Sequence, residues 1–201
     1  MSASTITHRL IEEGTKARSY FQIWWVLNNR AYFLDYASTM EHWEYSDFFV
    51  AASPGYFTLF VLALGKMFDR DERSAGFYSL RSALEQEGQS EIAKQIRTAL
   101  APLTVQVQRL MEIRNQSVVH NSFGIPRDQV YEKNGITIDE LRSLVETTCQ
   151  CITLAATALG IRDHALGSER VANATLKVLA GLKESLQPED ARLRKESKLP
   201  D

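Results

Sequence analysis

The sequence lacks an excess of charge of either sign. Aspartate and glutamate number 25 against 23 lysines and arginines, which gives a formal net charge of -2 over 201 residues. A protein that coats duplex DNA without sequence preference is usually far more cationic, because it must neutralise many phosphates. The balance of charge excludes a general DNA-coating role and leaves room for local contacts with RNA.

Cysteines and long apolar runs are also scarce. The longest apolar run, residues 56–65, is far shorter than the ~20 residues that a membrane-spanning helix needs. Cys149 and Cys151 stand two positions apart, so a helix turns their side chains to different faces and no mutual disulfide is expected. The polar, acid-containing first 13 residues differ from a secretory leader. We therefore expect a cytoplasmic protein that does not enter a membrane.

Dedicated motifs for phosphates and metals are missing. Gly65 and Lys66 lack the surrounding glycine-rich run of a phosphate-binding loop. His8, His42 and His164 show no ligand spacing among themselves or with the cysteines. We expect neither a metal nor another cofactor.

Helical periodicity dominates the chain, and strand signals are nearly absent. Thr137 and Glu140 form a capping-box pattern, and Gly160 is a natural terminator for the helix between them. Ser79, Ser90 and Ser168 are candidate caps of other helices. The expected helices cover residues 5–36, 47–68, 79–86, 90–120, 137–159 and 168–186.

One point within the second helix stays open at this level. Either a new helix begins with Ser53 as cap and Pro54 at its first position, or Pro54 kinks a longer helix. In both cases the pattern predicts one all-α domain over residues 1–186, a bundle of four main helices with additional short and terminal helices. A flexible basic tail is expected over residues 187–201.

Residues 114–120, RNQSVVH, contain the most informative residue choices in the chain. Arg114 falls in the middle of the apolar face of the long helix, where a buried guanidinium must be paired or lie where two surfaces meet. Such a conflict between pattern and residue choice is typical of a functional site. The apolar face consists of Ile92, Ile96, Leu100, Leu103, Val107, Leu110 and Met111.

His120 follows six positions later, which is ~120° around and ~9 Å along an ideal helix. Arg114 and His120 therefore share no face unless the helix bends or frays, or unless a second copy of the chain supplies the partner residue. A structural alternative is an ion pair between Arg114 and Asp69 or Glu112.

The same heptapeptide resembles the signature of the HEPN superfamily, in which an arginine, a polar residue and a histidine close a helix of a four-helix bundle. Residues 57–69 (FTLFVLALGKMFD), followed by 79–84 (SLRSAL), resemble the AbiU-like abortive-infection branch. Together these matches cover about residues 57–122. Gln116 stands where that branch typically has lysine, and Val119 where it has alanine, so one cation beside the site is missing. Ser122 replaces the tyrosine of HEPN toxins controlled by AMP transfer, so that control is not expected.

The resemblance implies an all-α HEPN-like fold, a homodimer with facing motifs, and metal-independent endoribonuclease activity in a toxin or antiphage effector. It implies that Arg114 and His120 are catalytic. We further expect Asn115 to orient the phosphate or the opposing arginine, and Gln116 and Ser117 to contact RNA. The implied product carries a 2′,3′-cyclic phosphate, and the implied partners are RNA and an antitoxin or defence protein. The alternative is a non-catalytic HEPN-like module that binds a nucleotide or a protein.

Overall fold

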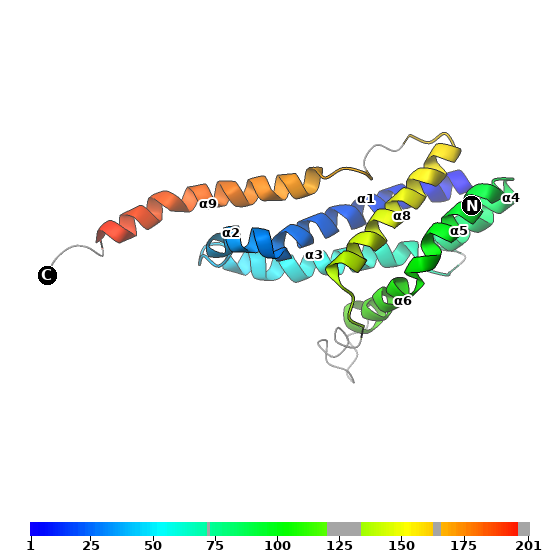
Figure 1. Ribbon diagram of the computed structural model, residues 1–201. Coiled ribbons are helices and arrows are strands. Elements are labelled where there is room, and N and C mark those ends of the chain that lie inside the picture. The colour runs from blue at the N-terminus through cyan, green and yellow to red at the C-terminus, as the bar shows by residue number, and fades with distance from the viewer. Residues whose placement is uncertain (72, 120–133, 163–165, 197–201) are drawn as a thin grey trace. The chain divides into compact units, whose positions relative to one another are not determined.

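The structure is a computed structural model that describes residues 1–71, 73–119, 134–162 and 166–196 (Figure 1). Within these ranges every regular element is a helix, which confirms the all-α prediction. The α-helices are α1 (Ala3–Asn28), α2 (Arg30–Met40), α3 (Ser46–Met67), α4 (Phe77–Gln86), α5 (Ser90–Leu100), α6 (Thr104–Ile113), α8 (Ile138–Ala158) and α9 (Arg170–Glu196). A 3-10 turn, η1 (Ala101–Leu103), and a π-helical turn, η2 (Arg114–Val119), complete the set.

The chain divides into two compact units, and the division falls inside α1 and α3. One unit comprises residues 1–20 and 57–168, and the other comprises residues 21–56 and 169–201. Each unit has buried apolar side chains of its own. The expected domain boundary at residue 187 stays a prediction.

The first unit holds the long helical segment that ends in Arg114. In this unit α5 packs against both α4 and α8, and α6 also packs against α8 (Figure 1). Its buried side chains recur at helical spacings of three and four, as an amphipathic helix requires. The largest fully buried ones are Ile6, Leu10, Phe60, Leu64, Met67, Leu80, Leu84, Ile96, Leu110, Ile113, Leu141 and Leu144.

In the second unit α2 packs against α9 over a small apolar cluster. The single helix expected over residues 5–36 is wrong, because Asn29 adopts an extended conformation (φ -72°, ψ 124°) and begins a new helix. The side-chain oxygen of Asn29 accepts a hydrogen bond from the Ala31 amide at 3.0 Å, which satisfies one of the free donors of α2. The cluster consists of Val26, Leu27, Met40, Phe49, Ala172 and Leu179.

Helix α3 continues through Pro54 without a new start. The Asn28 side-chain Nδ2 donates to the Ser53 hydroxyl at 3.0 Å, and this hydroxyl donates to Oδ1 of Asn28 at 3.2 Å. Ser53 therefore does not cap a helix that begins at Pro54. By length and composition alone α3 could cross a membrane, with a mean hydropathy of 1.7 over its most apolar 18 residues. Core helices of water-soluble proteins have the same length and composition, and the absence of a membrane contact stays a prediction.

Helix α9 extends further than its sequence pattern indicated. The expected end was Leu186, with a flexible tail from residue 187, but the helix continues to Glu196. Residues 191–196, ARLRKE, are all strong helix formers, so the helix gains from continuing into this charged segment.

The end of α8 follows a local sequence signal. At the end of α8 the amide of Ile161 donates to the Ala156 carbonyl at 2.8 Å, and that of Gly160 donates to Thr157 at 3.1 Å. This Schellman motif requires a left-handed residue, which Gly160 supplies with φ 66°.

At the start of α4 the expected cap is wrong by one turn. Gly76 is the cap residue, and the Ser79 hydroxyl accepts a hydrogen bond from the Gly76 amide at 3.1 Å.

The capping box at the start of α8 is confirmed. The Thr137 hydroxyl accepts from the Glu140 amide at 3.2 Å, and the Glu140 carboxylate accepts from the Thr137 amide at 2.8 Å. The hydrogen bond from the Thr137 backbone is the main cause that lowers the pKa of the Glu140 carboxyl. The two residues thereby satisfy amides that the first turn of a helix leaves without partners.

Replacing the threonine of this capping box tests its contribution. Thr137→Ala removes the hydroxyl acceptor, so the free energy of unfolding should fall by about 1 kcal/mol. Urea unfolding followed by circular dichroism measures the change. Thr157→Ala, at an exposed position inside α8, is the matched control and should leave stability unchanged or slightly higher. Equal midpoints for the two variants would contradict the assignment.

Candidate functional site

The segment that carries Arg114 is not the single helix expected over residues 90–120. It consists of α5, η1, α6 and η2 in succession. Pro102 lies in η1, where its missing amide and its ring prevent an ordinary α-helical continuation. A second change of geometry begins at Arg114 itself, where α6 gives way to the π-helical turn.

The π-helical turn changes how Arg114 and the residues after it are arranged around the axis. Single π turns inside α-helices are rare and are frequently found at functional sites. For Arg114 and His120 to meet, the helix had to depart from ideal α geometry, and it does so at Arg114. His120 and the side chain of Ser117 lie outside the described residues, so their predicted place in the site stays a prediction.

The Arg114 side chain lies directly against the backbone of α3 at Gly65. A Cβ atom added to Gly65 would stand 2.6 Å from Cδ and 3.2 Å from Nε of Arg114. Real Cβ atoms essentially never come that close to another heavy atom. Only a residue without a side chain therefore leaves room for the arginine in this position. The sequence pointed to Gly65 in one respect, because a glycine inside an apolar helix costs about 1 kcal/mol relative to alanine.

The charge of Arg114 is only loosely compensated. Its Nη1 atom lies 3.9 Å from Oδ2 of Asp69, at the long end of the range for an ion pair. The side chains of Arg114 and Asp69 are 21% and 36% exposed. The sequence offers Asp69 and Glu112 as possible ion-pair partners of Arg114, and the structure supports the pair with Asp69. At such exposure the pair contributes at most about 1 kcal/mol.

The Nε–H group of Arg114 is buried and has no hydrogen-bond partner among the described residues. A buried donor without an acceptor costs about 1–3 kcal/mol. The guanidinium is therefore held in place by packing rather than by a full set of hydrogen bonds. Because Nε is closed off from solvent, contact with an incoming oxygen atom is left to the Nη groups of this side chain, which is 21% exposed.

Glu112, the other carboxylate considered for Arg114, binds Gln116 instead. The Gln116 amide donates from Nε2 to Oε2 of Glu112 at 2.6 Å, one helical turn away. The Gln116 Oε1 atom is buried without a partner in the described part of the chain. The amide nitrogen of Gln116, a residue expected to contact RNA, is thus already bonded to Glu112. Asn115 is exposed and faces solvent.

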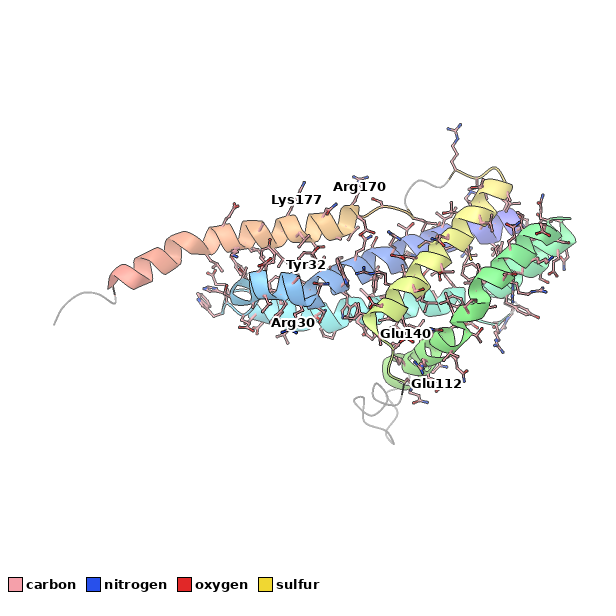
Figure 2. All side chains as sticks on the ribbon, in the orientation of Figure 1. Arg30, Tyr32, Glu112, Glu140, Arg170 and Lys177 are labelled. Atoms are coloured by element: carbon pink, nitrogen blue, oxygen red, sulfur yellow. The ribbon has the colours of Figure 1, made fainter. Side chains whose placement is uncertain are left out.

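Arg109 connects α6 to the chain that enters α8. Its Nη1 atom donates to the Gly135 carbonyl at 3.1 Å and lies 3.6 Å from Oε1 of Glu140. Figure 2 shows Glu140 at the start of α8 and Glu112 on α6. These contacts hold the residues just after position 133 beside the helix that leads to Arg114.

The described residues contain no group of three or more His, Cys, Asp or Glu side chains that could hold a metal ion. Cys149 and Cys151 are both buried, at 5% and 2% exposure. Burial, and to a lesser extent the neighbouring Cys149, raises the pKa of Cys151 to about 11. Both residues are buried in the packing around α8, and neither has the exposure of a reactive thiol.

The all-α architecture and the arginine at the end of a long helical segment are both features that the resemblance to the HEPN superfamily implies. Comparison with protein families makes the assignment specific: the AbiU2 family model of HEPN domains matches residues 4–175. The chain belongs to this family, which confirms the resemblance drawn from residues 57–122 and extends it to most of the chain. Searches of curated proteins and of solved structures gave no match.

The buried cysteines lead to a prediction about labelling. In the native protein at pH 8, an aromatic disulfide reagent should modify neither Cys149 nor Cys151, because both thiols are covered and that of Cys151 stays protonated. Absorbance of the released thiolate measures the reaction. In guanidinium chloride both cysteines should react, which serves as the control. Rapid labelling without denaturant would show that this face of α8 is accessible.

Proposed function

We propose that this chain is a metal-independent endoribonuclease of the HEPN type that acts as a toxin or antiphage effector. Membership of the AbiU2 family supports a HEPN-type function in general. The observation that supports catalysis is the state of Arg114: a permanent cation at the start of a π-helical turn, with a side chain that is 21% exposed and only loosely paired with Asp69. Such a group is suited to bind an oxygen of a phosphodiester.

In this reaction the side chain of His120 removes the proton from a ribose 2′-OH, and the 2′-oxygen attacks phosphorus. The bond from phosphorus to the 5′-oxygen breaks, and a second His120 donates a proton to that oxygen. Arg114 stabilises the negative charge that builds up on the other phosphate oxygens. The products are a 2′,3′-cyclic phosphate and a 5′-hydroxyl, and an unperturbed histidine pKa of ~6.5 suits both proton transfers.

The two histidine roles motivate a homodimer, in which each copy contributes one Arg114 and one His120. Asn115, being exposed, is available to orient the phosphate or the Arg114 of the second copy. Gln116 and Ser117 complete the RNA contact. The protein then acts in the cytoplasm, outside any membrane, with RNA as substrate and an antitoxin or defence protein as a further partner.

A second candidate function is a non-catalytic module that binds a nucleotide or a protein. The pairs Arg114–Asp69 and Gln116–Glu112 favour it, because both join residues of a single protomer. In that case Arg114 serves the fold, and His120 is a solvated residue at the helix end.

RNA cleavage by purified protein in the presence of EDTA separates the two functions. The wild type should cut total RNA or tRNA and leave 2′,3′-cyclic phosphate ends, which resist ligation even after alkaline phosphatase and become ligatable only when acid has opened the ring before the phosphatase is added. His120→Ala should lower the rate by at least ~10²-fold, as expected for loss of an acid or base. Arg114→Ala should have an effect of about 10²–10³-fold, as expected for loss of a charge-stabilising donor.

Arg97→Ala is the matched control, since it removes an arginine of the same long segment that is 60% exposed and pairs with Glu85 at 2.9 Å. It should cut like the wild type. Circular dichroism checks that all variants are folded. If His120→Ala cuts RNA as fast as the wild type, the ribonuclease proposal fails and the binding module is favoured.

A further inference from the structure

We infer that Gly65 and Asp69 are positioning residues that set where the Arg114 guanidinium stands. The inference rests on the proposed function for its catalytic consequence, but the geometry it describes can be measured without activity. Gly65 leaves the space that the stem of Arg114 fills, and Asp69 restrains the end of the same side chain. Both residues act on the reaction only through Arg114.

The role of Gly65 follows from the distances between its missing Cβ atom and the Arg114 side chain. The clash with a Cβ atom involves Cδ and Nε, which lie in the middle of a side chain with four rotatable bonds. An added methyl group therefore displaces the arginine rather than the backbone of either helix. Met111, the next neighbour, is at an ordinary contact distance of 3.6 Å from the added atom to Sδ. Alanine at position 65 thus moves the guanidinium while the surrounding core remains packed.

The Asp69 step follows from how that carboxylate is itself held. Just after α3 the backbone forms hydrogen bonds between residues three apart. The Phe68 amide donates to the Gly65 carbonyl at 3.2 Å, and the Asp69 amide donates to the Lys66 carbonyl at 3.4 Å. Oδ1 of Asp69 accepts from the Asp71 amide at 3.1 Å. The second oxygen, Oδ2, is left to face Nη1 of Arg114. The carboxylate is therefore oriented by its own backbone before it meets the guanidinium.

The two restraints act at different ends of one side chain. Gly65 fixes the stem and turns Nε into the protein, and Asp69 limits the swing of the terminal Nη1 atom. A guanidinium held in this way does not need to be reoriented when a phosphate arrives, and a displacement of ~1 Å at such a group can cost 10²-fold in rate.

The test of Gly65 compares two glycine-to-alanine changes in the same helix. Gly65→Ala should lower kcat by about 10²-fold, whereas Gly55→Ala, whose added Cβ meets nothing within 4 Å, should cut like the wild type. In an Arg114→Ala background Gly65→Ala should cause no further loss of kcat. In that background the melting temperature should rise by about 2–4 °C, because alanine favours the helix and the clash is gone.

A spectroscopic readout follows Arg114 directly. The side-chain Nε–H signal of Arg114, identified by its absence in Arg114→Lys, should exchange slowly with solvent in the wild type and in Gly55→Ala. In Gly65→Ala the signal should shift and exchange faster. If the signal is unchanged in Gly65→Ala, the inference is overturned, whatever the enzyme assay shows.

The test of Asp69 uses Asp69→Asn with Asp71→Asn as control, since Asp71 is an exposed neighbour that pairs with Arg73 at 2.7 Å. Asp69→Asn should lower kcat without raising KM, because the negative charge it removes opposes RNA binding. Asp71→Asn should leave kcat unchanged. A kcat for Asp69→Asn equal to that of the control overturns the Asp69 part of the inference.

The two proposals fail in different ways. If the wild type cuts RNA but Gly65→Ala cuts equally well, the positioning role is wrong and the ribonuclease survives. If no form of the protein cuts RNA, the ribonuclease proposal is wrong, and the Nε–H signal alone decides whether Gly65 positions Arg114.

Discussion

A guanidinium on the core-facing side of a helix needs a place where the neighbouring helix leaves room for it, and the rest of the site depends on that requirement. Gly65 provides the place on α3, and the stem of Arg114 lies 2.6 Å from where a Cβ would stand. This contact between Gly65 and Arg114 brings α3 and the start of η2, which follows α6, together at one point. It also decides which carboxylate the arginine meets, because Asp69 follows on the same segment one turn later. Packing therefore determines position here, and the ion pair adds a restraint at one end.

The helical frame was largely predictable because its signals are local. The capping box of Thr137 and Glu140 and the termination at Gly160 depend on a few neighbouring residues, and both are found as expected. The breaks at Asn29 and Pro102 were missed because apolar periodicity continues across them, and the extension of α9 was missed because its charged residues suggested a tail. Periodicity reports which face is buried, and it reports poorly where one helix ends and the next begins.

The candidate site was predictable in its central residue and not in its surroundings. Arg114 stands out from sequence alone because it interrupts an apolar face, and Asp69 could be named as a possible pair. Gly65 could not be paired with Arg114, since the two residues lie 49 positions apart and only the packing of α3 against η2 brings them together. The π-helical turn was equally out of reach, because a helical wheel assumes 3.6 residues per turn throughout.

The local electrostatics bear on why the proposed reaction needs two copies of the chain. Arg114 faces Asp69, Glu112 is bonded to Gln116, and Gln116 itself is uncharged. The chain as a whole carries a formal charge of -2, so no general basic field attracts RNA. One arginine that already faces a carboxylate is a weak anion site by itself. Under the proposed function, a second Arg114 from a facing copy is the most direct source of the missing positive charge, and it makes a rigid, pre-positioned guanidinium more important than it would be in a site rich in cations.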